Sequence, residues 1–265
     1  MTALITGASS GIGLELARIF AANKHDVVLV ARSAGKLREL ARECEASGVR
    51  AHVIPADLAV PDAARSILDT VARLGVEIDV LVNNAGFGVY GRFVETPLVS
   101  ELESIQVNVV ALTELTKRFL PAMVARRRGR ILNVASTAGF LPGPLMAVYY
   151  ATKAYVVSFS EAIANELEGT GVTVTALCPG PTASGFQAAA HLESSRIVSL
   201  LRKATSRSVA EAGYDAVMAG KVLCIPGVLN TLSVLAPRLF PRAIIRTVVR
   251  AIQEPQAAAK AKGAR

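Results

Sequence analysis

Tyr149, Lys153 and Ser136 are the side chains of this sequence whose types and spacing best suit acid–base chemistry. Tyr149 and Lys153 stand four residues apart, so on a helix they share one face and the ammonium lies near the phenol. A neighbouring cation lowers the phenol pKa from about 10 toward the range of a general acid at neutral pH. Ser136, thirteen residues before the tyrosine, could hold a carbonyl oxygen against the phenol. Taken alone, the tyrosine–lysine spacing is more typical of an ordinary amphipathic helix.

The elements that must position these residues alternate regularly up to about Cys178. Apolar runs of strand length follow helical patterns, which predicts a parallel sheet with right-handed crossovers and helices on both faces. We therefore expect an α/β fold of three layers, α/β/α, with a doubly wound Rossmann sheet of seven strands. The strands are predicted at 3–6, 26–31, 51–56, 79–82, 130–135, 172–178 and 221–225. The helices between them are predicted at 11–23, 35–47, 61–74, 98–126 and 148–169.

The regular alternation stops after Cys178, where Pro179-Gly180-Pro181 opens a stretch of small and polar residues. A long excursion from the carboxyl end of a strand is where a substrate lid lies, and we predict one at about 182–206 with a helix near 188–203. Ser208 and Glu211 predict a capping box for a short helix that ends at Gly220. The whole chain, 1–265, is expected to form a single Rossmann-type domain.

Residues 227–252 are predicted to form a helical extension rich in leucine, valine and isoleucine. Pro237 and Pro241 interrupt it, and its longest uncharged stretch is too short to span a bilayer. Packing on the edge of the sheet is the favoured interpretation, and weak contact with a membrane surface is the alternative. The arginines that punctuate this stretch are Arg238, Arg242, Arg246 and Arg250.

The excess of 29 basic over 21 acidic residues, a formal charge of +8, is densest in the run Arg126, Arg127, Arg128 and Arg130. This run directly precedes a predicted strand, at the end of the sheet opposite to the ligand crevice, so we expect it to complement a helix C-terminus. Aromatic residues make up 5% of the chain and tryptophan is absent, which argues against nucleic acid as a partner. Three scattered cysteines and the lack of a secretory signal predict no metal site and a reducing, cytoplasmic location.

A glycine-rich turn, Thr6 to Gly13 with the spacing Gly-x3-Gly-x-Gly, joins the first predicted strand to the first helix. Glycine lets the backbone turn sharply and approach a pyrophosphate, whose charge is met by the amides at the helix N-terminus. The position of the turn between a strand and a helix therefore predicts a dinucleotide site. The cofactor contacts predicted in this turn are Gly7, Ser9, Ser10, Gly11, Ile12 and Gly13.

Arg32 ends the second predicted strand, where a carboxylate would select NAD(H) and an arginine suits a ribose 2′-phosphate. Since no acid is present there, we predict NADP(H) in preference to NAD(H), the alternative being a merely solvated arginine. Asp57 follows the third strand and could meet the adenine amino group or cap the next helix. The segment Asn84-Ala85-Gly86 follows the fourth strand and keeps bulky side chains out of the crevice.

In their order and spacing these motifs resemble the short-chain dehydrogenase/reductase family of the classical type, from Thr2 to about Pro226. The resemblance implies that Tyr149 is the general acid, Lys153 binds the nicotinamide ribose and lowers the tyrosine pKa, and Ser136 orients the carbonyl. It also implies that Asn108 holds a water in a proton relay. Tyr150 is the rival acid, although the family spacing favours Tyr149. Further cofactor contacts implied by the resemblance are Asp57, Leu58, Asn84, Ala85, Gly86, Tyr149, Lys153, Pro179, Gly180, Thr182 and Ser184.

The resemblance, to bacterial 3-oxoacyl reductase-like oxidoreductases in particular, implies reduction of a carbonyl to an alcohol or the reverse, in a homodimer or homotetramer. An apolar substrate is expected, such as a 3-oxoacyl thioester, a steroid-like ketone or a xenobiotic ketone. A non-catalytic NADP-binding sensor on the same fold is the alternative, but a sensor is expected to lose the acid or the lysine. The side chains expected around the substrate, which could equally be core, are Phe87, Val89, Phe140, Leu141, Leu145, Met146 and Phe186.

Overall fold

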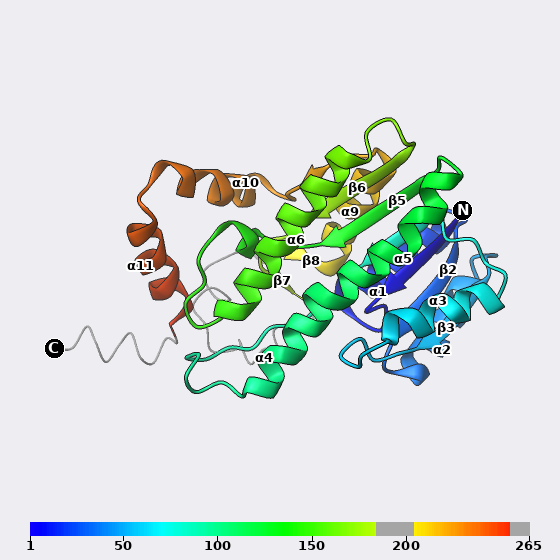
Figure 1. Cartoon of the computed structure of the whole chain (residues 1–265), viewed down its shortest axis with the longest axis horizontal. Coiled ribbons are helices and arrows are strands. Elements are labelled where there is room, and N and C mark those ends of the chain that lie inside the picture. Colours follow the sequence, from blue (N-terminus) through cyan, green and yellow to red (C-terminus); the bar gives the residue numbers. More distant parts are fainter. Residues whose placement is uncertain (184–203, 255–265) are drawn as a thin grey trace.

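A seven-stranded parallel sheet forms the centre of the protein in the computed structural model, which describes residues 1–183 and 204–254 (Figure 1). The strand order is β3-β2-β1-β4-β5-β6-β9. Because the order reverses direction beside β1, a crevice opens there outside the carboxyl ends of the strands. The strands are β1 (Thr2–Thr6), β2 (Asp26–Ala31), β3 (Ala51–Pro55), β4 (Val80–Asn83), β5 (Gly129–Val134), β6 (Val172–Leu177) and β9 (Leu223–Cys224).

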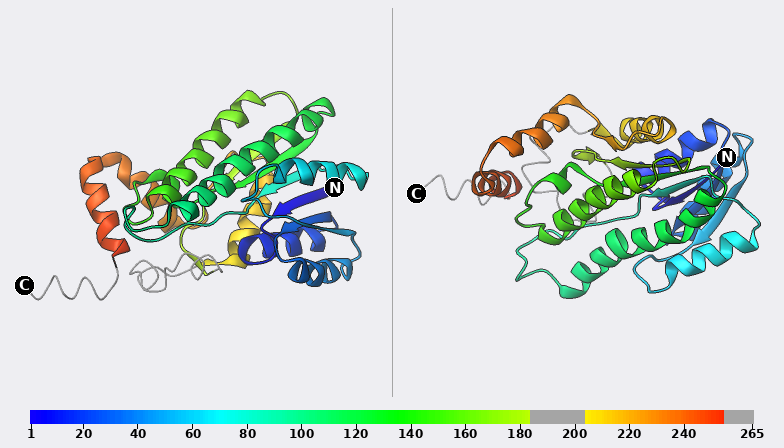
Figure 2. Two further views of the ribbon diagram at one scale, coloured as in Figure 1. Left: turned by 60° about the horizontal axis from the view of Figure 1, so that its bottom comes forward. Right: turned by 45° about the horizontal axis from the view of Figure 1, so that its top comes forward.

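Helices cover both faces of the sheet and bury two separate apolar layers (Figure 2). On one face lie α1 (Gly11–Ala22), α2 (Ala34–Glu45) and α9 (Ser206–Met218), whose buried side chains include Phe20 and Leu37. On the other lie α3 (Ala63–Arg73), α5 (Leu112–Ala125) and α6 (Ala147–Glu166). Strands buried on both sides need the nearly continuous apolar runs that this sequence has. The predicted three-layer doubly wound fold is confirmed.

The single helix predicted over 98–126 is divided into three parts. An α-helix, α4 (Leu98–Ile105), continues into a π-helical turn, η1 (Gln106–Ala111), and then into α5. A π-helical turn adds one residue to the helical repeat and often marks a functional position. Asn108 lies within it, and its buried side chain bonds to Phe87 of another segment rather than to solvent. Tertiary contact therefore sets this local geometry.

The predicted capping box at Ser208 is wrong, because α9 begins two residues earlier. Its N-cap is Thr205, whose Oγ1 accepts a hydrogen bond from the Ser208 amide at 3.0 Å. Glu211 instead pairs with Arg207 at 2.7 Å. The start is set by a two-stranded sheet in which β7 (Thr182–Ala183) pairs with β8 (Ala204–Thr205). The predicted lid and the helix near 188–203 lie almost wholly outside the described residues.

The carboxyl-terminal extension consists of α10 (Val228–Leu235), the short 3-10 helix η4 (Ala236–Leu239) and α11 (Arg242–Gln253). The prediction that it packs on the edge of the sheet is wrong. It projects from one end of the molecule (Figure 1), and α11 packs against Met146 and Tyr150 near the start of α6. The chain leaves β9 at the carboxyl edge of the sheet, so the extension reaches the crevice. Within 1–183 and 204–254, no helix is long and apolar enough to cross a membrane.

The arginine run that precedes β5 lies at the opposite end of the sheet, as predicted. Arg128 pairs with Glu77 at 2.9 Å and with Asp79 at 3.0 Å. Arg127 donates a hydrogen bond to the carbonyl of Gly169, just beyond the end of α6, at 2.8 Å. These positive charges are therefore engaged in structural contacts away from the crevice.

Candidate active site

A cavity of about 820 Å³ runs along the carboxyl ends of the strands. It extends from Arg32 after β2, across the glycine-rich turn, to Gln253 at the end of α11. The candidate cofactor residues that line it are Gly7, Ser9, Ser10, Gly11, Ile12, Arg32, Asp57, Leu58, Asn84, Ala85, Gly86, Pro179, Gly180 and Thr182. Ser136, Tyr149 and Lys153 line it as well, whereas Gly13 and Asn108 do not. Ser184 lies outside the described residues.

The glycine-rich turn is held against the end of β4. Gly7 and Gly11 adopt positive φ angles of 65° and 58°, which favour glycine. A Cβ on Gly13 would stand 2.5 Å from the Gly7 carbonyl oxygen and 2.4 Å from Nδ2 of Asn84. That amide donates a hydrogen bond to the Thr6 carbonyl at 2.8 Å. Only glycine at position 13 lets the first turn of α1 pack this closely against Gly7 and Asn84, although Gly13 itself does not line the cavity.

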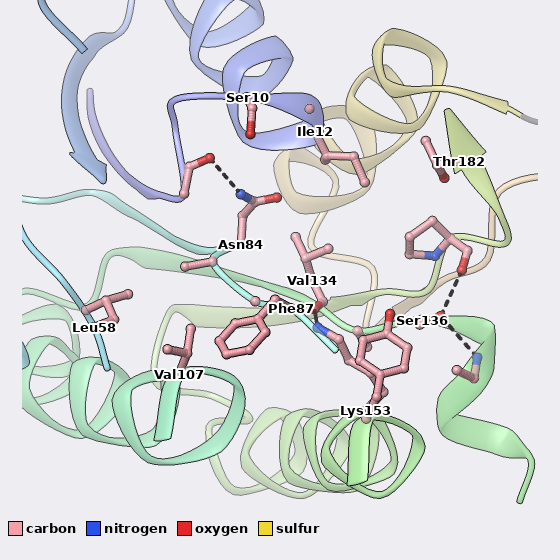
Figure 3. A pocket seen from close by; sticks show the side chains of 18 of the residues that line it. Ser10, Ile12, Leu58, Asn84, Phe87, Val107, Val134, Ser136, Lys153 and Thr182 are labelled. Carbon is pink, nitrogen blue, oxygen red and sulfur yellow. Dashed lines mark hydrogen bonds between the residues drawn. The ribbon is translucent and has the colours of Figure 1, made fainter. Parts of the chain in front are cut away.

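The first turn of α1 has features that fit a dinucleotide. Its N-cap, Ser10, adopts an extended conformation, and the Ser10 side chain makes no capping hydrogen bond. The amides at this helix end therefore remain available to an anion, and the helix dipole favours negative charge there. Ser10 and Ile12 both face the cavity (Figure 3). The residues present thus fit a pyrophosphate against the turn.

Two basic side chains border the cavity beyond β2. Arg32 was predicted, and Lys36 in the first turn of α2 joins it. Both are exposed, and neither forms an ion pair within the described part of the chain. The acidic residues that line the cavity are Asp57 and Glu103, and neither lies in the connection from β2 to α2. This edge is therefore positive and lacks the carboxylate that would select a ribose 2′-hydroxyl.

Asp57 lies on the cavity wall just beyond β3. Its Oδ1 accepts a hydrogen bond from the amide of Ala59 at 3.0 Å, which is a turn within its own loop. The N-cap of α3 is Asp62, so the helix-cap alternative for Asp57 is wrong.

Ser136, Tyr149 and Lys153 line the same part of the cavity, Ser136 after β5 and the other two on α6. Figure 3 shows Ser136 and Lys153 close to each other. Ser136 follows β5, and its Oγ accepts a hydrogen bond from the Ala138 amide at 3.1 Å. The Lys153 ammonium donates to the Val134 carbonyl at 2.8 Å and lies 5.8 Å from the centre of the Tyr149 ring. A Cβ on Gly86 would come within 3.4 Å of this ammonium. The loop after β4 can therefore approach the Lys153 ammonium closely, because residue 86 is a glycine.

Burial shifts the pKa values of both residues of the pair. It raises the pKa of Tyr149 above its ordinary value, and a hydrogen bond with the Ser136 side chain opposes this rise in pKa. Burial also lowers the pKa of Lys153 to about 8. The Lys153 ammonium donates to a backbone carbonyl rather than to the phenol oxygen, and the lowering of the tyrosine pKa by this ammonium stays a prediction. At neutral pH the site therefore holds a protonated phenol and a cationic lysine.

Hydrogen bonds within the protein hold the Asn108 side chain. Its Nδ2 donates to the Phe87 carbonyl at 2.9 Å and to Oγ1 of Thr152 at 3.0 Å, while its Oδ1 accepts from the Phe87 amide at 3.0 Å. The side chain is 1% exposed. The side chain joins the loop after β4 to α6. The water that Asn108 is expected to hold in a proton relay stays a prediction.

The substrate end of the cavity is apolar and includes part of the carboxyl-terminal extension. Of the expected apolar residues, Phe87, Leu141 and Met146 line it. Phe140 packs in the core with Val156 and Val157. The residues Val89 and Leu145 do not line the cavity, and Phe186 lies outside the described residues.

Gln253 is the buried residue that the sequence reasoning missed. The Gln253 side chain is 2% exposed, and its Nε2 donates a hydrogen bond to the Tyr150 hydroxyl at 2.5 Å. The backbone carbonyl of Gln253 accepts a hydrogen bond from the Tyr90 hydroxyl at 2.6 Å. Ile245, Val249 and Gln253 follow one another at intervals of four, and all three are buried. This spacing could have revealed it, since a polar residue that continues an apolar helical stripe faces the same interior. Asn230 and Ser233 of α10 also line the cavity unpredicted.

Comparison with known proteins agrees with this arrangement. Residues 1–194 match the family model described as short chain dehydrogenase. Ketoacyl reductase HetN from Nostoc sp. is 35% identical, over 82% of this chain and 75% of that protein. Eight curated relatives at 35–40% identity align over 52–75% of their own lengths.

Two solved structures are similar over most of the chain. A short-chain dehydrogenase from Sphingobium yanoikuyae in complex with NADPH is 33% identical with a TM-score of 0.80, covering 90% of this chain and 94% of that one. A bulky-bulky ketone specific alcohol dehydrogenase from Comamonas testosteroni is 31% identical with a TM-score of 0.75, covering 90% and 92%.

Proposed function

This chain belongs to the short-chain dehydrogenase family and is an NAD(P)-dependent oxidoreductase, and on that premise we propose that it uses NADPH to reduce a ketone on a mainly apolar substrate. The proposal rests on one continuous cavity that is lined by three groups of residues. A positive edge at Arg32 and Lys36 suits the 2′-phosphate, Tyr149 and Ser136 suit the reacting oxygen, and the apolar end beyond them suits the substrate. The reverse oxidation uses the same groups.

The chemistry assigned to the chain is proton transfer and orientation. When bound, the cofactor supplies the hydride that reaches the carbonyl carbon. The Ser136 hydroxyl holds the carbonyl oxygen, and the Tyr149 phenol donates its proton to that oxygen as the alcohol forms. The resulting phenolate is stabilised by the nearby Lys153 ammonium. Burial raises the pKa of Tyr149, so the phenol carries the proton that it donates; the cation of Lys153 is expected to favour its release.

The proposed substrate is a bulky or long apolar ketone, such as a 3-oxoacyl thioester, a steroid-like ketone or a xenobiotic ketone. Phe87, Leu141 and Met146 along the cavity support this class. So do the similarity to a ketoacyl reductase and to a dehydrogenase specific for bulky-bulky ketones. Apolar pockets discriminate substrates mainly by size and shape.

A screen of NADPH oxidation tests this proposal directly. The panel contains 3-oxoacyl thioesters, steroid ketones, sugars and small aldehydes, each assayed with NADPH and with NADH. We expect turnover of the apolar ketones and little turnover of sugars. Tight NADPH binding without turnover of any compound would refute the proposed reductase and favour the sensor alternative.

The pH dependence of reduction is expected to report Lys153. Its pKa is lowered to about 8 by burial, so kcat/KM for the ketone at saturating NADPH should fall as the pH rises through 8 and the ammonium loses its proton. Tyr149 does not cause this fall, because its raised pKa keeps the phenol protonated there. In Lys153→Arg the charge persists at all these pH values, so any residual activity should not fall. A flat profile in the parent enzyme would contradict the assignment.

Self-association is proposed through α4, α5 and α6. Val110 on η1, between α4 and α5, is 43% exposed and Tyr155 on α6 is 38% exposed, and Leu98 and Val99 on α4 are each 67% exposed. Burying such side chains between copies is favourable. Sedimentation velocity is expected to give the mass of a dimer or tetramer, and a monomer across micromolar concentrations would contradict it.

A further inference from the structure

The outer surface of the carboxyl-terminal extension carries an unusually dense set of exposed apolar side chains. Val228 and Leu229 on α10 are 78% and 75% exposed, and Leu239 and Phe240 in the connection to α11 are 83% and 56% exposed. Leu232 and Leu235 continue the stripe on α10, because residues four and seven apart share a helix face. A patch of this kind on a protein surface marks a site of interaction.

The charge around this surface is positive. Between 227 and 254 the sequence has four arginines and one acid, Glu254. The acid is paired with Arg250 at 3.2 Å. Arg242 and Arg246 are exposed, and neither makes an ion pair with any residue in 1–183 or 204–254. Within residues 227–254, the exposed apolar surface is therefore accompanied by two exposed arginines without an ion pair, while the one acid is paired.

We infer that this surface, formed by α10, η4 and α11, docks on an anionic lipid membrane. Large apolar side chains can insert among acyl chains while arginines meet the anionic headgroups. A second copy of the chain is a poorer occupant, since it would bring the unpaired Arg242 and Arg246 of both copies toward one another. A soluble acidic partner would match the arginines but would leave much of the apolar surface without an apolar counterpart.

Other residues of the same two helices form part of the cavity. Asn230, Ser233 and Gln253 line it, while Ile245 and Val249 pack against Met146 beside the substrate end. Membrane docking would therefore place the substrate end of the cavity next to the bilayer surface. An apolar ketone dissolved in the bilayer could then enter without crossing water, and this consequence, unlike the docking itself, rests on the proposed function.

Cosedimentation with vesicles tests the docking with the full chain. The vesicles are phosphatidylcholine alone or phosphatidylcholine mixed with phosphatidylglycerol. We expect binding to the mixed vesicles and much weaker binding to the neutral ones. Because each arginine near an anionic surface strengthens binding roughly fivefold, Arg242→Gln combined with Arg246→Gln should weaken it roughly 30-fold. Leu229→Ser combined with Leu239→Ser should abolish it.

Matched variants elsewhere on the surface separate docking from nonspecific attraction. Arg38→Gln combined with Arg42→Gln removes the same charge from α2, and Val60→Ser with Leu74→Ser removes exposed apolar side chains from another region. Both should bind vesicles like the parent. NADPH oxidation with a water-soluble ketone, measured in parallel, shows that each variant is folded and tests the proposed reductase independently of the vesicles.

Three results would overturn the inference. The first is no binding of the parent to the mixed vesicles. The second is equal loss of binding in the two arginine pairs, which would indicate attraction to net charge alone. The third is binding to the mixed vesicles that survives Leu229→Ser with Leu239→Ser, which would show attraction to the headgroups without insertion of the apolar surface. If the parent protein does not bind vesicles and the substitutions Leu229→Ser and Leu239→Ser dissociate an oligomer, the surface is an interface between copies of the chain.

Discussion

Tyr149→Phe is expected to lower kcat for ketone reduction by about 10³, within the range of roughly 10² to 10⁴ that a positioned general acid contributes. The change removes one oxygen atom and keeps the ring, so the packing against Met146 and Tyr150 is retained. Without the phenol, no group of the cluster is placed to give a proton to the oxygen held by Ser136. Stopped-flow or steady-state NADPH oxidation measures the loss.

The neighbouring Tyr150→Phe is the matched control for that substitution. Tyr150 is buried, accepts a hydrogen bond from Gln253 at 2.5 Å, and its pKa is raised to about 12 by burial. Its removal should change kcat by less than about tenfold and act mainly on KM, because it disturbs the wall formed by α11. NADPH affinity should be unchanged in both variants. If Tyr150→Phe abolished turnover and Tyr149→Phe did not, the assignment of the acid would be reversed.

Arg32→Ala combined with Lys36→Ala is expected to lower kcat/KM for NADPH by on the order of 10² and to leave the value for NADH nearly unchanged. Hydrogen bonds to charged groups each contribute about 1.5–3 kcal/mol, and solvent at these exposed positions reduces that contribution. Arg32→Ala alone should cause the larger part of the fall in kcat/KM for NADPH, since the Arg32 guanidinium can pair with a phosphate through two hydrogen bonds. Initial rates at varied cofactor concentration measure the effect.

Arg38→Ala serves as the charge control, because Arg38 is exposed on the same helix but does not line the cavity. It should leave the ratio of the two cofactor efficiencies unchanged. Equal efficiency with NADH and NADPH in the parent enzyme would refute the proposed preference. An equal fall for both cofactors in the double variant would show that the two cations act on the shared part of the cofactor.

Much of this site could be predicted because its residues belong to short segments that each carry their own signal. The glycine-rich turn, Arg32 and the segment Asn84-Ala85-Gly86 each follow a predicted strand. In a parallel sheet the carboxyl ends of the strands meet at one edge, so correct strand assignment was enough to bring these residues together. Tyr149 and Lys153 share a helix face because four residues make about one turn.

Other features depended on contacts between distant segments. Nothing near Asn108 in the sequence indicates that its side-chain amide forms hydrogen bonds with the backbone of Phe87. Thr205 rather than Ser208 caps α9, since the pairing of β7 with β8 fixes where the helix begins. The carboxyl-terminal extension reaches the substrate end rather than the sheet edge, and Gln253 thereby meets Tyr150, which is 103 residues away.

Apolar periodicity was sufficient to predict the three-layer fold, and the resemblance of the motifs in their order and spacing predicted the family and the roles of Tyr149 and Lys153. These signals are local, and local spacing maps directly onto helix faces and strand ends. The protonation states of the pair depended on tertiary structure, because burial raises the tyrosine pKa and lowers the lysine pKa to about 8. Burial is a property of everything that packs around a residue, and so are the substrate wall at Gln253 and the exposed face of α10.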